Sequence, residues 1–158
     1  MFVLCACEES QAVTREFRKL GHEAYSCDLQ DCSGGFPEWH IKCDVQLLLS
    51  EPWDIIIAFP PCTFLSFAGN RHLNQPGRLE KRLAAADFFM KIINSPCSRI
   101  AVENPVGYMN SFYRKPDQII NPFQFGDPYR KRTCLWLKGL PLLIPDYVSP
   151  APDPVYVR

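Results

Sequence analysis

The chain alternates short apolar runs with amphipathic or polar stretches. Residues 2–6 are apolar and partly β-branched, as expected for a buried strand. The following segment, "CEESQAVTREFRKLGH", carries Val13, Phe17 and Leu20 at helical spacing. Gly21 then stands where the end of a helix favours a left-handed residue. This opening therefore predicts a strand followed by a helix.

The same alternation continues through the middle of the chain. "EAYSCD" predicts a second strand that ends on Asp28, and "IKCDV" predicts a third that ends on Asp44. "WDIIIAF" contains three consecutive isoleucines, which is typical of a strand covered on both faces. Residues 78–93 repeat apolar side chains at three- and four-residue spacing and predict an amphipathic helix. "SRIAVEN" predicts a fifth strand.

Strands that alternate with helices predict an α/β fold with a doubly wound, mostly parallel sheet. We expect its central strand at residues 54–58, between the strands at 2–6 and 99–103. The length of 158 residues fits one domain, 1–158, in which the proline-rich segment 141–158 forms an extended tail.

The charge and the apolar runs limit the classes of partner. The 17 basic and 17 acidic residues give a formal net charge of zero, which indicates no general affinity for nucleic acid or membranes, although a local basic patch is compatible with it. The apolar runs are too short to span a bilayer, and the first residues turn acidic where a signal peptide would stay apolar. We therefore expect a soluble cytoplasmic protein.

The cysteines raise the question of a metal. Without a secretion signal, the eight cysteines are expected to be reduced thiols. Cys27, Cys32, His40 and Cys43 could supply four zinc ligands within 17 residues. Their spacing matches no compact zinc motif, so we expect no bound metal, and a zinc-dependent module remains an alternative.

Polar residues collect at the predicted strand ends. Asp28, Asp44, Cys62 and the pair Glu103 and Asn104 all lie there, at the edge where open α/β sheets bind ligands. The two prolines before Cys62 restrict the backbone and present the thiol in a nearly fixed direction. A cysteine nucleophile with a carboxylic acid on the next strand suits conjugate addition to a pyrimidine ring. The alternative is an inert core cysteine.

Several motifs resemble those of DNA cytosine-5 methyltransferases. "FPPCTFLS" resembles their Pro-Cys-Gln-x-Phe-Ser motif, and "VENPVG" resembles their Glu-Asn-Val motif. "SCDL", "CDV" and "WDIIIAFPPC" stand where that family has a ribose-binding acid, a Gly-Asp-Ile segment and an Asp-led strand that enters the catalytic loop. "FGDPYRKRTCLWLKG" is similar to the family's Gly-x-Pro-Gln-x-Arg-x-Arg segment. The resemblance covers residues 1–138 and implies a Rossmann-like, S-adenosylmethionine-dependent methyltransferase fold.

The resemblance assigns the catalytic roles. Cys62 would attack C6 of cytosine, Glu103 would protonate or hydrogen-bond N3, and Asn104 would hold the loop around it. C5 would then accept the methyl group. Arg132 would be the cation near the pyrimidine O2 or a phosphate, if the basic segment is shifted by one residue from strict alignment, which otherwise places Lys131 at the first arginine of the motif. A solvated basic face is the alternative for this segment.

The implied cofactor is S-adenosyl-L-methionine. Asp28 would hold its ribose and Asp44 would lie near its adenine. The family's first loop is rich in glycine, whereas "CACEESQ" has none. Glu8 or Glu9 could contact the methionine amino group instead, or Glu9 and Ser10 could simply cap the following helix. The other expected contacts with the cofactor come from the first loop and the start of the catalytic loop: Cys7, Glu8, Glu9, Ser10, Gln11 and Pro60.

The resemblance also has gaps. A target-recognition domain and a C-terminal segment that completes the cofactor pocket do not fit after residue 138. The chain therefore resembles a minimal core of the type found in bacteriophage genomes, and a truncated or degenerate copy is the alternative. The expected substrate is cytosine-containing DNA or a cytosine nucleotide, and exposed apolar edges make a homodimer an expectation. The alternative is a non-catalytic nucleotide- or nucleic-acid-binding module that retains the fold.

Overall fold

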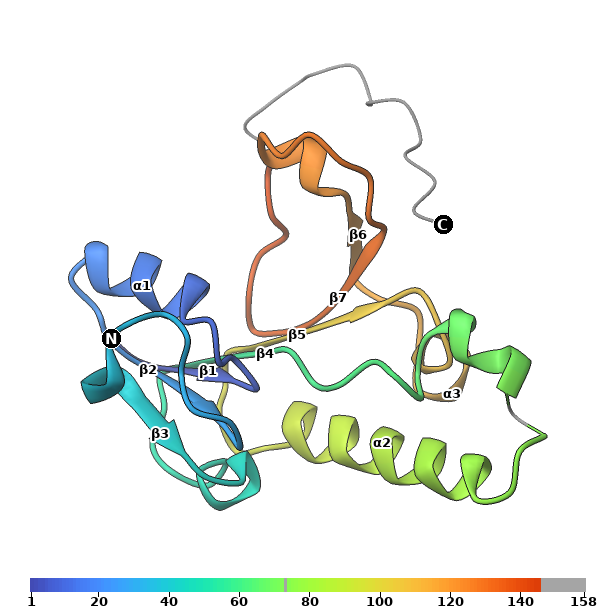
Figure 1. The fold of residues 1–158 in the computed structure, drawn as a ribbon. Helices are drawn as coiled ribbons and strands as arrows, with labels where there is room; N and C mark the ends of the chain where they lie inside the picture. Colours follow the sequence, from blue (N-terminus) through green and yellow to red (C-terminus); the bar gives the residue numbers. More distant parts are fainter. Residues whose placement is uncertain (73, 146–158) are drawn as a thin grey trace.

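The chain forms one mixed sheet with helices on both faces (Figure 1). The computed structural model describes residues 1–72 and 74–145. Seven strands lie in the order β3-β2-β1-β4-β5-β7-β6. Their bounds are β1 Phe2–Ala6, β2 Glu23–Asp28, β3 His40–Lys42, β4 Ile55–Ala58, β5 Ile100–Pro105, β6 Gln118–Ile120 and β7 Thr133–Lys138.

The expected centre of the sheet is confirmed. β4 pairs in parallel with β1 on one side and with β5 on the other. Ile55 lies opposite Val3, and Ile56 lies opposite Ile100. Because parallel strands end at the same edge, the segments that leave β1, β2, β4 and β5 gather at one place.

A helix layer covers each face of the sheet. α1 (Ala12–Lys19) packs on β1 and β2, where Phe17 contacts a small cluster that includes Val3 and Ile55. α2 (Arg78–Ile93) and the short α3 (Met109–Phe112) lie on the opposite face, as Figure 1 shows. The larger core lies on that face and includes Phe89 and Trp136, whose rings meet edge to face.

The helix ends follow the sequence signals. α1 stops before Gly21, which has the expected left-handed φ of 80°. α2 begins and ends at the predicted residues. Four short 3-10 turns complete the regular structure: η1 Pro37–Trp39, η2 Val45–Leu47, η3 Phe67–His72 and η4 Pro122–Phe125.

The third strand is shorter than expected. The Cys43 amide turns back to the Ile41 carbonyl at 3.1 Å, so the ladder ends at Lys42. Asp44 then caps η2 by accepting a hydrogen bond from the Gln46 amide at 2.9 Å. The carboxylate therefore follows the strand by two residues instead of ending it.

The antiparallel hairpin of β6 and β7 was not anticipated. β7 pairs with β5, so that Leu135 lies opposite Glu103, and β6 continues the sheet outward. Of the expected extended tail, residues 141–145 contain no helix or strand, and residues 146–158 lie outside the described residues. Within the described ranges, the helices are too short or too polar to cross a bilayer.

Candidate functional site

The loop after β4 presents Cys62 on a turn that is held from two sides. Asn104, almost fully buried on β5, donates a hydrogen bond from Nδ2 to the Pro60 carbonyl at 2.8 Å. The Cys62 carbonyl accepts from the amides of Leu65 and Ser66 at 3.0 and 2.9 Å. Cys62 itself is exposed. Asn104 is therefore in contact with the loop that bears Cys62, as expected.

Arg82 fixes the next part of this loop, although Arg82 was not predicted as a site residue. Its guanidinium donates to the Phe64 carbonyl at 2.9 Å and to Asn70 Oδ1 at 2.6 Å. It also lies 5.0 Å from the centre of the Tyr108 ring. Arg82 is buried although it carries a charge. In the sequence, its burial is indicated by its position one helical turn before Ala86, on the side of α2 that faces the core.

Glu103 lies on the face of β5 that looks towards α1. It lines a cavity of about 510 Å³ whose other walls are largely apolar and include Phe59 and Leu135. Burial raises the pKa of the Glu103 carboxyl above its usual range, and the nearby charge of Lys131 partly opposes this shift. Cys62 does not line this cavity. Cys62 and Glu103, the predicted nucleophile and acid, are on neighbouring segments but do not share a cavity in this conformation.

Asp28 and Asp44 line a second cavity, of about 250 Å³. The Gln30 amide donates to Asp28 Oδ1 at 3.0 Å. Both Asp44 oxygens accept from the Gln46 side chain. Pro61, next to Cys62, forms part of the wall together with exposed Leu29. Asp28 and Asp44 thus share a cavity with the loop that bears Cys62.

The loop between β1 and α1 keeps a left-handed backbone without glycine. Cys7 has φ 59° and Gln11 has φ 57°, a region that side chains other than glycine enter at a cost. The Glu8 carboxylate accepts hydrogen bonds from the Val13 amide at 2.6 Å, the Thr14 amide at 3.2 Å and the Thr14 hydroxyl at 2.6 Å. Glu8 is therefore a buried cap of α1, and its carboxylate is occupied by the helix.

Gln11 is also occupied within the fold. Its fully buried amide donates to the Phe36 carbonyl at 2.8 Å and accepts from the Phe36 amide at 3.1 Å. Gly34 packs so closely here that an added Cβ would come 2.5 Å from the Gln11 Cβ. The side chain of Gln11 thus joins the first loop to residues 34–36 and faces away from the cavities.

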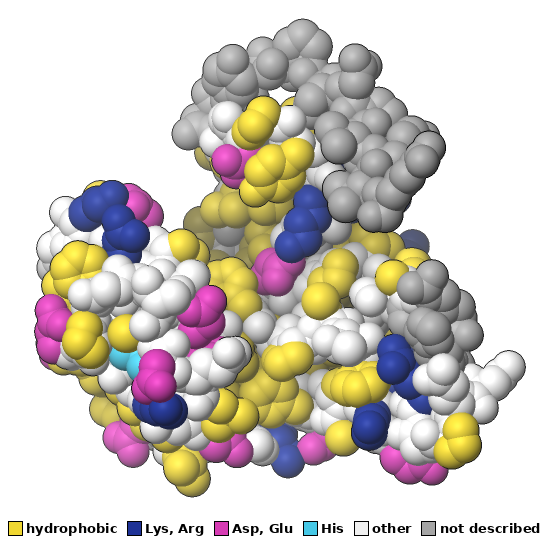
Figure 2. Space-filling model, in the orientation of Figure 1, with side chains coloured by type: hydrophobic (Ala, Val, Ile, Leu, Met, Phe, Trp, Pro, Cys, Tyr) yellow, Lys and Arg dark blue, Asp and Glu magenta, His cyan; other side chains and the backbone are white. Residues whose placement is uncertain are grey.

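The remaining first-loop residues line a third cavity, of about 260 Å³. Glu9 and Ser10 are partly or fully exposed along it. It shares Cys7 with the cavity of the two aspartates, and it shares Phe59 with the cavity of Glu103. The three cavities therefore adjoin one another. Those of the two aspartates and of the first loop lie at the carboxyl ends of the strands, whereas that of Glu103 extends over the sheet face past Ile57 to Ile55, at the start of β4. Figure 2 shows a hollow in this region with hydrophobic walls and charged side chains on its rim.

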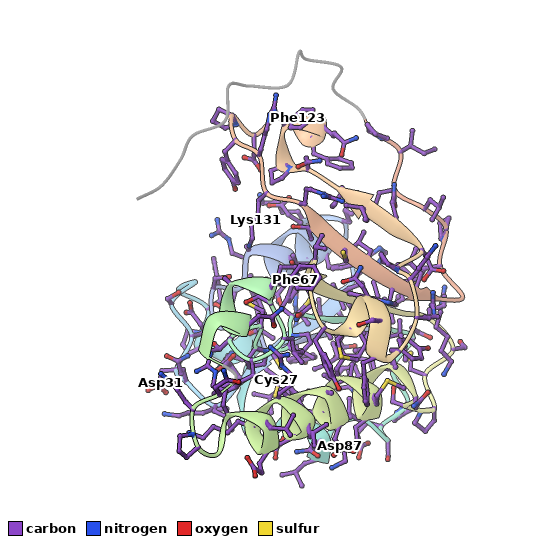
Figure 3. The ribbon with its side chains drawn as sticks, turned by 90° about the vertical axis from the view of Figure 1, so that its right-hand side faces the viewer. Cys27, Asp31, Phe67, Asp87, Phe123 and Lys131 are labelled. Atoms are coloured by element: carbon purple, nitrogen blue, oxygen red, sulfur yellow. The ribbon has the colours of Figure 1, made fainter. Side chains whose placement is uncertain are left out.

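The basic segment before β7 contributes cations near Glu103. Lys131 acts electrostatically on Glu103, whereas Arg132 acts on Cys134 and opposes the rise of its pKa caused by burial. Figure 3 shows Lys131 on the segment that enters β7. The cation that acts on Glu103 is therefore Lys131, which strict alignment places at the first arginine of the motif, whereas the predicted Arg132 acts on Cys134.

The cysteine cluster does not assemble around His40. The imidazole of His40 lies 2.8 Å from Ser26 Oγ and 2.9 Å from the Gln30 carbonyl. Among the described residues, the histidine, cysteine and acidic side chains form no group of three that could hold a metal ion. Cys27 and Cys43 do approach each other, with 3.8 Å between the sulfur atoms.

Comparisons with known proteins show what this fold resembles. No protein-family model and no curated protein matches the chain. The solved Dnmt2 methyltransferase of S. pombe superposes with a TM-score of 0.57 and 12% identity, over 91% of this chain and 51% of that chain. A putative DNA modification methyltransferase encoded within prophage Cp of E. coli gives a TM-score of 0.58 and 14% identity, over 87% of this chain and 46% of that chain.

This chain thus spans about half the length of both structures. At such low identity the likeness is one of fold. The chain has the Rossmann-like, mostly parallel α/β fold of these two methyltransferases.

Proposed function

We propose that the chain is an S-adenosylmethionine-dependent methyltransferase that acts on C5 of cytosine through a covalent bond from Cys62 to C6. One observation carries the proposal. Three cavities share walls one after another, from that of Asp28 and Asp44, past that of the first loop, to that of Glu103 on the sheet face. The loop that bears Cys62 contributes Pro61 to the wall of the cavity of the two aspartates. This order suits a nucleoside at one end and a reacting base at the other.

The residues along the edge fit the cofactor. Asp28 uses one carboxylate oxygen on Gln30 and keeps the other for a ribose hydroxyl. Asp44 lines the same cavity, where its carboxylate can accept from an adenine amino group. Cys7, Glu9 and Ser10 border the space for the amino-acid portion. When bound, S-adenosylmethionine supplies an electrophilic methyl group.

The chain's own groups would then act on the base. The Cys62 sulfur adds to C6 while the Glu103 carboxyl, whose raised pKa favours its protonated form, donates a proton or hydrogen bond at N3. C5 becomes nucleophilic and gains the methyl group. After the C5 proton is removed, the C6–S bond breaks and the thiolate leaves. Productive addition requires the exposed Cys62 loop to close towards Glu103, with Asn104 as its fixed end.

The proposed substrate is cytosine in DNA or in a nucleotide. Lys131 and Arg132 stand on the segment beside Glu103, where cations can hold a phosphate or the pyrimidine O2. The net charge of zero gives the rest of the surface no general attraction for a long polyanion. A short or single-stranded substrate therefore suits the chain better than an extended duplex.

Calorimetric titration with S-adenosylmethionine tests the proposal. We expect binding by the wild type and a loss of about tenfold or more in Asp28→Asn, because a hydrogen bond to a charged group contributes about 1.5–3 kcal/mol. Asp31→Asn is the matched control, since Asp31 only pairs with Lys42 at the surface. The absence of binding at high ligand concentration would contradict the proposal and favour a non-catalytic binding module.

A further inference from the structure

We propose that Cys27 and Cys43 form an oxidation site, in which a disulfide between them closes the cavity of the two aspartates. The sulfur atoms lie 3.8 Å apart, and the Cys27 thiol also faces the Cys43 carbonyl at 3.4 Å. A disulfide needs about 2 Å between its sulfurs, so a small movement suffices. The part of the inference that concerns the cofactor rests on the proposed function, whereas the pairing of the thiols does not.

The fold lets the two thiols approach. Cys27 is fixed in β2, while Cys43 follows the last residue of the edge strand β3, where the backbone has already turned. No further strand pairs with the outer edge of β3 within the described sheet. Cys43 can therefore move towards Cys27 without breaking a central ladder of the sheet.

The pair is adjacent in the chain to both predicted ligands of the nucleoside. Asp28 follows Cys27 directly, and Asp44 follows Cys43 directly. All four residues line the same cavity of about 250 Å³. A bond between the sulfurs would pull the two carboxylates together and change the width of the space between them. Oxidation and ligand binding should therefore oppose each other, and a bound ligand should slow oxidation by the same coupling.

A peroxide provides the oxidant. Hydrogen peroxide converts the more accessible Cys43 thiol to a sulfenic acid and releases one water. The Cys27 sulfur then attacks the Cys43 sulfur, the S–OH bond breaks, and the hydroxyl leaves with the thiol proton as a second water. Burial raises the pKa of Cys27 to about 12, with Cys43 as a second cause, so this second step should be slow at neutral pH and faster in alkali.

Peptide mapping after peroxide treatment of the full chain tests the pairing. Trypsin releases Cys27 with Cys32 in residues 20–42, and Cys43 with Cys62 in residues 43–71. In the double variant Cys32→Ser, Cys62→Ser, a crosslink between these peptides can only join Cys27 and Cys43. We expect this crosslink, and we expect it to disappear on reduction and in the further variant Cys43→Ser. If the folded double variant shows no such crosslink after peroxide treatment, the proposal is overturned.

Calorimetry then tests the effect on the cavity. We expect the oxidised double variant Cys32→Ser, Cys62→Ser to bind S-adenosylmethionine at least tenfold more weakly than the same protein after reduction. If a protein with a verified crosslink binds S-adenosylmethionine equally well before and after reduction, the disulfide does not close the cavity. If reduced protein shows no binding, the proposed function fails, while the peptide map still decides whether the thiols pair. Cys27→Ala, which cannot form the bond, should bind equally before and after peroxide.

Discussion

Replacement of Arg82 by methionine should loosen the loop that follows Cys62. Methionine keeps an unbranched apolar stem in the buried position but cannot donate hydrogen bonds. The variant therefore loses the contacts to the Phe64 carbonyl and to Asn70, together with the cation–π contact to Tyr108.

The expected cost follows from these three contacts. Hydrogen bonds from a charged donor contribute about 1.5–3 kcal/mol each, and a cation–π contact contributes about 0.5–2 kcal/mol. Removing the charge also removes the cost of keeping it out of water, which offsets a part of this sum. We expect the free energy of unfolding to fall by about 2–4 kcal/mol.

Urea denaturation measures the loss, and hydrogen exchange of the Leu65 and Ser66 amides measures its location. Both amides bond to the Cys62 carbonyl, and their protection should fall about tenfold for each 1.4 kcal/mol lost locally. Arg78→Met is the control, because Arg78 lies on the same helix and its guanidinium stacks over the Phe64 ring. Unchanged stability and unchanged protection of these amides in Arg82→Met would refute the assigned role.

Three further predictions concern the sheet edge. Burial raises the pKa of Glu103 in the folded protein, so its charge destabilises the fold as pH rises above the ordinary carboxyl range. In urea denaturation at neutral pH, Glu103→Gln should therefore have a higher free energy of unfolding than wild type. This difference should vanish near pH 4 or below. Glu8→Gln should lower the free energy of unfolding by about 1–3 kcal/mol, because it weakens three hydrogen bonds at the start of α1, whereas Glu9→Gln should change it by less than about 0.5 kcal/mol; the reverse order would contradict the cap. Asn104→Ala should cost about 1–3 kcal/mol in the same assay, because the Pro60 carbonyl loses its donor, and a neutral result would show that this bond does not hold the loop.

The sequence predicted the parallel part of the sheet because each of its strands has a local signal. β1 and β4 are short apolar runs, and α2 has a clear helical period. β6 has only three residues, and its pairing with β7 depends on segments more than ten residues apart. Such short strands gain their conformation from the neighbour they pair with, which a local pattern does not reveal.

The first loop shows a second limit. The first loop has none of the glycines of the family's loop, yet Cys7 and Gln11 adopt left-handed conformations. Two hydrogen bonds between the Gln11 side chain and the backbone of Phe36, 25 residues away, support this geometry. Side chains far along the chain can hold a strained residue in place, so residue type at the loop alone did not predict it.

The motifs named candidate site residues, and the structure shows how some of them are arranged. Asp28 and Asp44 share a cavity, and Asn104 donates a hydrogen bond to the loop that bears Cys62. The motifs could not show that Cys62 stands exposed, outside the cavity of Glu103. The position of a surface loop depends on its contacts with other elements and on bound ligands, and the sequence of the loop itself predicts neither.

The covalent role of Cys62 is the central claim, and a mechanism-based trap tests it most directly. The protein is incubated with S-adenosylmethionine and a cytosine substrate that carries fluorine at C5, and its intact mass is measured. Fluorine cannot leave as the C5 proton does, so the thiol stays bonded to C6. We expect an adduct with wild type, mapped to residues 43–71, and none with Cys62→Ser. Methyl transfer to ordinary cytosine without any adduct, or full activity of Cys62→Ser, would contradict the account.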